Sequence, residues 1–451
     1  MKRTLYWMTK DLRINDNAAF NLANQAETLL CVFVVDKQWF EASNFQSKHL
    51  GNARWKFLQG CLDDLDQQLK ALGQQLYIVY GDSLTTLCQL CDKYQITDFI
   101  STRLPGTYEN RLISQFREKH PQISVNLVEQ FTLFCEKSLP FELENLPESF
   151  SKFRKILPET SSIDLQPVIE FLPNKFESLP EMSNFKPSWL PVIAFNNKQG
   201  AKFNGGEQSG LKHLQQYFAS TLPSNYKQVR NSLAGWENSS KLSAWLSYGC
   251  ISARQVVNYI KQYELLSGKN SSTECLYLEI LWREYFQWLH FKVGTKIYQF
   301  KGISEQKPLT TYYAERFNKW CFSNTPSSLI NACMNELRLT GYLSNRGRQI
   351  VASYLVNELG IDWRYGAAWF EERLIDYDAA VNWGNWQYIA GVGANPRGGR
   401  HFNIEKQSEI FDPDRVYQTA WTENIETSRC QTLDSVDASD WPIQAKHNNG
   451  N

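Results

Sequence analysis

The sequence predicts an N-terminal α/β domain with a doubly wound parallel sheet, and an all-helical C-terminal domain. In residues 1–134, short apolar runs typical of buried strands alternate with helical stretches, which is the pattern of a parallel sheet covered by helices on both faces. From Gly205 the pattern turns helical. We therefore expect a linker over residues 135–204, a helical domain over 205–420 and a loose tail over 421–451.

Five strands and four helices are expected in the α/β domain. The strands are residues 4–8, 29–35, 75–81, 98–103 and 124–129, and the helices are 17–26, 47–72, 84–94 and 108–119. No G-x-G-x-x-G motif follows the first strand, so a standard dinucleotide site is not supported. The stretch DLRINDN (11–17) stands at the carboxyl end of that strand, where ligands of open α/β sheets bind. The alternative is a turn with Asp16 as a helix cap.

The linker is predicted from its prolines, because eight of the sixteen in the chain fall between residues 140 and 191. Segments of this kind are usually extended and lie over a surface. The run LPESFSKFRKILPE (146–159) is expected to join the two domains. Beyond Tyr417 the sequence is polar with little periodicity, which predicts the loose tail.

Composition excludes several classes of protein. The chain lacks an N-terminal signal sequence and any stretch of 18 apolar residues, so no membrane partner is expected. Its ten cysteines are scattered, with only Cys88 and Cys91 in a C-x-x-C, which is too few for a zinc site. Reduced cysteines favour a cytoplasmic protein, and we expect a monomer without a metal. The net charge is zero, so global charge does not point to nucleic acid.

The stretch from Thr340 to Phe402 predicts three helices with polar residues on their apolar faces. Asp378, Asn382 and Trp386 have the spacing i, i+4, i+8, so they follow one helix face. A buried polar group without a partner costs about 1–3 kcal/mol. The partner is either a bound polar ring system or, as the alternative, an internal ion pair between Arg348 and Asp376 with the tryptophans as ordinary core.

The motifs SNRGRQIVASYLV, GIDWRYGAAWFE and LIDYDAAVNWGNWQY resemble the flavin-binding core of the photolyase/cryptochrome family, and the Asn-Arg-Gly-Arg-Gln form resembles its DASH branch. The resemblance covers nearly all of residues 1–420. It implies a blue-light flavoprotein that holds FAD in the helical domain and splits cyclobutane pyrimidine dimers, preferentially in single-stranded DNA, by electron transfer from reduced FAD. The alternative it leaves open is a photoreceptor or regulatory cryptochrome with little repair activity.

The resemblance also implies a set of flavin contacts. Arg348 and Asp376 would pair beside the isoalloxazine, Asp378 would bond its polar edge, and Asn382 would face its reducible nitrogen. Residues at the diphosphate and elsewhere around the cofactor would be Tyr226, Ser239, Ser240, Lys241, Leu242, Ser243 and Arg283. Hydroxyls and a lysine at a helix N-terminus favour phosphate, although an ordinary serine cap is the alternative.

Substrate contacts are expected from Glu279 and Trp282, which share a helix face with Arg283. The family match implies that Trp282 stacks on a substrate base and Glu279 bonds it; the alternative is a local Glu279–Arg283 ion pair beside a core tryptophan. Ser344 and Asn345 stand where enzymes for the 6-4 class of photoproduct have paired histidines. Further DNA contacts would be Asn345, Gln349, Tyr388, Arg397 and Arg400, where Gln349 and Tyr388 give a wide, polar pocket suited to single strands.

Three more assignments follow from the resemblance. Trp386, Trp363 and Trp320 would carry electrons from the surface to the flavin, with core packing as the alternative. A methenyltetrahydrofolate antenna would bind between the domains near Glu109. The segment 319–337 departs from the family pattern at Asn331, where relatives usually have Asp, and this puts substrate affinity in doubt.

Overall fold

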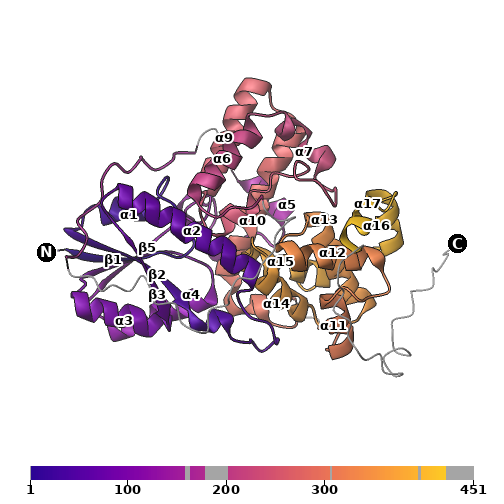
Figure 1. Ribbon diagram of the computed structural model, residues 1–451, viewed down its shortest axis with the longest axis horizontal. Helices are drawn as coiled ribbons and strands as arrows, with labels where there is room; N and C mark the ends of the chain where they lie inside the picture. Colours follow the sequence, from indigo (N-terminus) through magenta and orange to yellow (C-terminus); the bar gives the residue numbers. More distant parts are fainter. Residues whose placement is uncertain (1, 158–162, 178–201, 305–306, 395–397, 423–451) are drawn as a thin grey trace.

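The computed structural model describes residues 2–157, 163–177, 202–304, 307–394 and 398–422, and it has the predicted fold class (Figure 1). Five parallel strands form a sheet in the order β3-β2-β1-β4-β5. The strands are β1 Arg3–Trp7, β2 Thr28–Asp36, β3 Leu76–Gly81, β4 Asp98–Thr102 and β5 Ser124–Val128. The strand order therefore reverses at β1, which pairs with β2 on one side and β4 on the other.

Helices cover both faces of the sheet because alternate strand residues point to opposite sides. Tyr6 belongs to the core that α1 (Ala18–Ala23) and α2 (Asn52–Ala71) cover, whereas its neighbours Leu5 and Trp7 belong to the core under α3 (Ser83–Tyr94) and α4 (Thr107–Lys119). Figure 1 shows α1 and α2 on one side of the sheet and α3 on the other. The first helix begins after Asn17, whose side chain accepts hydrogen bonds from the amides of Ala19 and Phe20, so the alternative of Asp16 as the cap is wrong.

The remainder of the described chain is helical. Short 3-10 turns span Lys37–Phe40, Glu136–Ser138, Leu143–Asn145 and Gly294–Tyr298, and the helices are α5 Phe150–Ile156, α6 Glu207–Phe218, α7 Leu222–Val229, α8 Ser243–Ser247, α9 Ala253–Ser267, α10 Ser271–Val293, α11 Ala314–Cys321, α12 Ser328–Thr340, α13 Asn345–Ser353, α14 Trp363–Arg373, α15 Ala379–Ala390, α16 Ile404–Phe411 and α17 Val416–Thr422. None of the helices in these described ranges is long and apolar enough to span a membrane.

Two helices of the Thr340–Phe402 stretch begin at aspartate caps. Asp362 accepts from the amide of Arg364 at the start of α14, and Asp378 accepts from the amide of Val381 at the start of α15. The first helix of the stretch differs from the prediction, because the expected helix over 345–359 changes to a π-helical turn at Tyr354–Glu358. Asn357 there donates to the carbonyl oxygens of Ser353 and Arg400, both at 2.9 Å, so the turn fixes the loop that precedes α16.

The linker is only partly extended. Residues 163–177 do lie along the α/β domain, where the carbonyl of Asn174 accepts from the amide of Leu29 at 2.9 Å. Residues 146–156 instead form α5 and its approach, held on α10 by Tyr285 and Lys292, which donate to the carbonyls of Pro147 and Leu146 at 3.2 and 3.1 Å. The boundaries at 134, 204 and 420 stay predictions.

Candidate functional site

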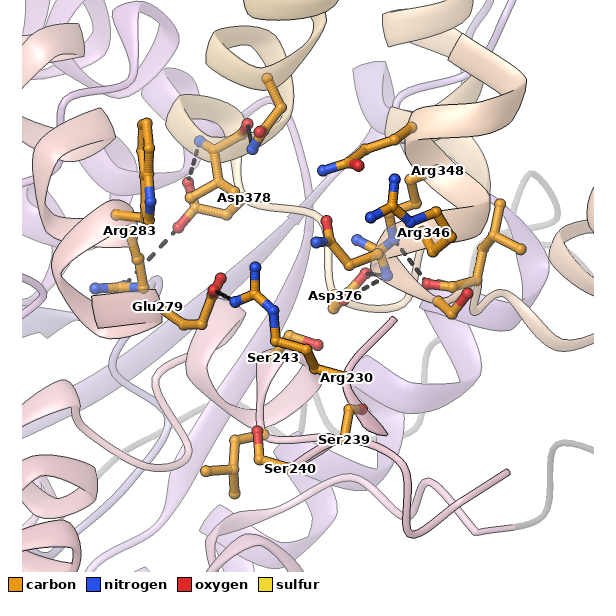
Figure 2. Close-up of a pocket in the computed structure, with 18 of the residues that line it drawn as sticks. Arg230, Ser239, Ser240, Ser243, Glu279, Arg283, Arg346, Arg348, Asp376 and Asp378 are labelled. Atoms are coloured by element: carbon orange, nitrogen blue, oxygen red, sulfur yellow. Dashed lines mark hydrogen bonds and ion pairs between the residues drawn. The ribbon is translucent and has the colours of Figure 1, made fainter. Parts of the chain in front are cut away.

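A cavity of about 570 Å³ lies within the helical region and collects most of the predicted site residues. One wall comes from α7, α8, α9 and α10, and the other from α13, α14, α15 and the turns before them (Figure 2). The predicted residues that line it are Tyr226, Ser239, Ser240, Lys241, Leu242, Ser243, Glu279, Trp282, Arg283, Asn345, Arg348, Gln349, Asp376, Asp378, Asn382, Trp386, Tyr388 and Arg400. Arg397 lies outside the described residues.

Arg348 and Asp376 form the predicted ion pair across the turn between α14 and α15. The Nη2 atom of Arg348 lies 2.8 and 3.0 Å from the two carboxylate oxygens, and its Nε atom donates to the carbonyl of Leu343. Burial opposes the positive charge, but the adjacent Asp376 carboxylate raises the pKa of Arg348, so this guanidinium stays charged at neutral pH. A fixed charge pair of this kind in a cavity wall is a binding site for a polar ring edge.

Asp378 and Asn382 are oriented by bonds on the protein side. Gln287 donates from Nε2 to both oxygens of Asp378, at 2.9 and 2.7 Å, and Arg283 lies 3.8 Å from the same carboxylate. Asn382 donates from Nδ2 to the carbonyl of Ala367 at 3.0 Å. This leaves its Oδ1 as the atom available to a ligand, so Asn382 presents an acceptor to the cavity.

The Ser239–Ser243 run forms the opposite wall. α8 begins at Ser243 without any side-chain cap, so the alternative of an ordinary serine cap is wrong. Lys241 has a left-handed backbone (φ 54°) and is buried, with its ammonium over the ring of Tyr342 at 4.6 Å. Hydroxyls and one buried cation therefore line this wall, a combination that suits a diphosphate.

Glu279 pairs with an arginine that the sequence had not indicated. Its carboxylate accepts a hydrogen bond from Arg230, which follows α7, whereas Arg283 donates to the carbonyl of Phe131 at 3.0 Å. The alternative of a local Glu279–Arg283 pair is thus wrong. Burial raises the pKa of Glu279, and the adjacent guanidinium of Arg230 opposes that rise.

Trp282 has one face covered by the linker. Phe150 of α5 stacks on it with ring centroids 3.8 Å apart and planes 14° apart, while Tyr388 meets it edge-on at 6.2 Å. Tyr388 in turn accepts a hydrogen bond from Arg400 at 2.8 Å. Phe286 also stacks on Trp282, with centroids 5.6 Å apart and planes 28° apart, so this indole has ring partners from both α5 and α10.

Arg230 and Arg346 line the cavity beside Arg400, and sequence reasoning missed both. Arg346 donates to Asn231 at 2.9 Å, its Nε atom is buried without a hydrogen-bond partner, and its guanidinium lies 4.7 Å from the ring of Phe411. Burial and the nearby guanidinium groups of Arg230 and Arg400 lower the pKa of Arg346. The signal was present in the motif SNRGRQ, where Arg346 stands between two residues already singled out.

Comparison with known proteins agrees with this geometry. The model of the FAD binding domain of DNA photolyase matches residues 276–449, and that of DNA photolyase matches residues 4–172. The chain is 41% identical over 442 residues to the cryptochrome DASH of Idiomarina loihiensis, covering 98% of this chain and 96% of the relative. With the protein of the same name from Vibrio parahaemolyticus it is 41% identical over 449 residues, covering 99% and 98%. The chain belongs to the DASH branch of the photolyase/cryptochrome family.

Solved structures of the family support the same conclusion. A Synechocystis cryptochrome superposes with a TM-score of 0.88 at 32% identity, covering 98% of this chain and 94% of that one. A class III photolyase from Agrobacterium tumefaciens superposes with a TM-score of 0.80 at 24% identity, covering 93% and 86%, which shows the shared fold.

The three tryptophans assigned to the photolyase-type electron relay are all buried. Trp386 is 2% exposed, and Trp363 and Trp320 are 0% exposed. Trp320 contacts Trp386 directly, with ring centroids 6.3 Å apart. None of the three therefore reaches the surface of the molecule, and their assignment to the electron relay stays a prediction.

Two further expectations concern residues outside the cavity. Glu109 begins α4 of the α/β domain, where burial raises the pKa of its carboxyl and the nearby Lys10 opposes that rise. Glu371 of α14 is also close enough to act on it, so Glu109 lies at the junction with the helical region. Asn331 does not line the cavity; it closes its own loop with three hydrogen bonds of 2.8 Å to Thr325, and its substitution for Asp has a structural role.

Proposed function

We propose that this protein uses FAD and blue light to split cyclobutane pyrimidine dimers in single-stranded DNA. The observation that carries the proposal is that one cavity combines a buried polar set with a partly exposed aromatic and cationic set. The buried set is Arg348, Asp376, Asp378 and Asn382, and the outer set is Arg230, Trp282, Arg346, Tyr388 and Arg400. The first set suits a flavin and the second a nucleotide strand (Figure 2).

The buried set would hold the isoalloxazine in a fixed orientation. The Arg348–Asp376 pair and the Asp378 carboxylate offer donors and acceptors to the polar edge of the ring, and Gln287 keeps Asp378 in place. The Oδ1 atom of Asn382 would accept a hydrogen bond from an N–H on the reducible nitrogen. Lys241 and the neighbouring serines would hold the diphosphate. Bound in its reduced form, FAD supplies the light-driven electron that opens the dimer.

The outer set would hold the dimer and its strand. Trp282 lines the cavity beside Tyr388, which meets it edge-on, and these two rings would contact the bases of the dimer. The carboxyl group of Glu279, which accepts a hydrogen bond from Arg230, would form hydrogen bonds with a base.

Three arginines with few carboxylate partners suit the phosphates that flank a dimer. Arg230 has Glu279 as a partner, while Arg346 and Arg400 bond neutral groups on the protein, Asn231 and Tyr388. Guanidinium groups bind phosphate bidentately, so the strand backbone supplies the charge compensation that Arg346 lacks. Binding should therefore weaken with salt. Asn345, which is exposed, would contact the same DNA strand.

The preference for single strands would come from weak stacking at the pocket. Gln349 and Tyr388 stand at its rim as an amide and a single ring, which stack less strongly than an apolar chain and an indole. Extruding a dimer from duplex costs about a few kcal/mol, whereas extrusion from a single strand costs much less because the dimer is already unpaired.

A folate antenna near Glu109 is part of the proposal. The support is a half-buried carboxylate at the junction of the two regions, near Lys10, which can bond the pterin-type edge of a methenyltetrahydrofolate. An absorption spectrum of gently purified protein tests this assignment: a folate band beside the flavin bands is expected, and flavin bands alone would contradict it.

The test of the activity is illumination of the reduced protein with a dimer-containing single-stranded oligonucleotide. We expect the dimers to disappear under blue light and to persist in the dark, and Arg346→Gln should weaken oligonucleotide binding without loss of FAD. A flavin-loaded protein that leaves the dimers intact under blue light would refute the repair function and favour the photoreceptor role.

A further inference from the structure

A ladder of aromatic rings leads away from the cavity beyond the tryptophans already discussed. Trp386 lines the cavity, and its ring centroid lies 6.3 Å from that of Trp320. Phe317 stacks on Trp320 with centroids 6.0 Å apart and planes 19° apart. Phe317 also contacts Tyr365 of α14, at 5.7 Å. The path therefore continues from a buried indole to a phenol.

A second path reaches the same phenol. Trp363 lies 5.7 Å from Trp383, and Trp383 lies 6.2 Å from Phe45 of the α/β domain. Phe45 contacts Tyr365 edge-on at 5.2 Å. This row also ends at Tyr365, but Trp363 and Trp383 do not line the cavity, so the path from the cavity runs through Trp386, Trp320 and Phe317.

Tyr365 stacks on a second tyrosine that reaches solvent. Its ring lies 4.1 Å from that of Tyr312, with planes 18° apart. Trp320, Trp363 and Trp383 are at most 3% exposed, whereas Tyr312 and Tyr365 are both partly exposed. The tyrosine pair is accordingly where the ladder meets the surface.

We propose that the Tyr312–Tyr365 pair is the surface terminus of the electron path, where an external one-electron donor such as a thiol or ascorbate meets the protein. The inference rests on FAD binding in the cavity, and not on the identity of the DNA substrate. It assigns to two tyrosines the end position that the buried Trp320 cannot occupy.

The electron balance of the step is complete without another cofactor. After Trp386 has lost an electron to the photoexcited flavin, the positive charge moves outward as each indole takes an electron from the next. Tyr365 or Tyr312 then gives up one electron and its phenolic proton, the proton passes to water, and a neutral tyrosyl radical remains. Burial raises the pKa of Tyr312, so its phenol holds a proton to release at neutral pH. A thiol or ascorbate then donates one hydrogen atom to the tyrosyl radical, which restores the phenol, and is itself oxidised by one electron.

Phenylalanine keeps the rings and removes the oxidisable hydroxyls, so the test is the double variant Tyr312→Phe/Tyr365→Phe. Photoreduction of bound FAD by an external thiol should slow on the order of tenfold, and the tyrosyl radical seen by electron paramagnetic resonance under light should disappear. Flavin content should stay at the parent level. When the FAD is first reduced chemically in the dark, dimer repair on later illumination should also be unchanged. This measurement separates failure of this inference from failure of the repair function.

The matched control is Tyr313→Phe. Tyr313 is 42% exposed and adjacent to Tyr312 in sequence, but its ring lies under the guanidinium of Arg316 at 4.3 Å. This variant should photoreduce at the parent rate and keep the radical signal. Parent-rate photoreduction with an intact tyrosyl signal in the double variant would overturn the inference, as would loss of both in the control.

Discussion

Two regions of the molecule concentrate buried polar groups, and they use them in opposite ways. In the loop at the carboxyl end of β1, Asp11 accepts hydrogen bonds from Tyr6, Thr102 and Gln130, and Arg13 donates to the carbonyl of Gly249. In the cavity of the helical region, residues such as Asn382 are held by one bond on the protein side and present another atom to the cavity. In the loop, by contrast, the charged side chains of Asp11 and Arg13 are bonded within the protein.

The difference shows that the polar residues of the loop at 11–17 are used to join the two regions of the molecule. The amides of Ile14 and Asn15 donate to the carboxylate of Glu207 on α6, at 2.7 and 2.9 Å, and Arg254 pairs with Asp16 at 2.9 Å. The sheet edge is therefore joined to the helical region, and its polar residues stabilise that junction. A ligand site is recognised by polar atoms that have no protein partner, more than by its place in the topology.

The largest effect is expected at the cavity. Arg348→Ala removes the partner of Asp376, whose side chain is 1% exposed, and breaking a buried pair typically costs about 3–5 kcal/mol. The variant should lose FAD and unfold at a lower denaturant concentration, measured by flavin absorbance and chemical denaturation. Normal stability and full flavin content would show that the pair does not support the cavity.

A smaller effect, of another kind, is expected at the junction. Glu207→Ala leaves the buried amides of Ile14 and Asn15 without acceptors, which costs about 1–3 kcal/mol. The free energy of unfolding should fall, while the ratio of FAD to folded protein should equal that of the parent, because Glu207 does not line the cavity. Loss of flavin from variant protein that is still folded would contradict the claim that Glu207 stabilises only the junction.

The sequence was sufficient for the parts of both regions that depend on local pattern. The alternation of strands and helices fixes the sheet, and Asp362 and Asp378 cap the helices that follow them. Side-chain contacts between segments that are far apart in the chain have no such pattern in the sequence. Glu279 meets Arg230 across two helices, and Phe150 reaches Trp282 from the linker, because burial and shape decide these contacts. The π-helical turn also escaped prediction, since it depends on bonds from Asn357 to a distant loop.

The pH dependence of stability sharpens the comparison further. His290 on α10 is fully buried, and burial lowers its pKa to about 4 from the usual 6.5. Between those values the unfolded chain binds a proton that the folded protein does not, so stability falls as the pH drops from 6.5 towards 4. The slope is about 1.4 kcal/mol per pH unit.

The check is His290→Gln, compared with the parent by denaturation at pH 7 and pH 5. The variant should lose less stability on acidification than the parent does. Equal losses in the two proteins would mean that His290 accepts a proton in the folded state.

The account depends most on the claim that one cavity serves both a flavin and a dimer taken from a single strand. Its direct test is the rate of blue-light repair of the same dimer in single-stranded and fully paired oligonucleotides, at matched subsaturating concentrations with reduced protein. Fast repair of the single strand and slow repair of the duplex are expected, because Gln349 and Tyr388 recover little of the cost of extrusion. Equal rates on the two substrates would contradict this assignment of the pocket.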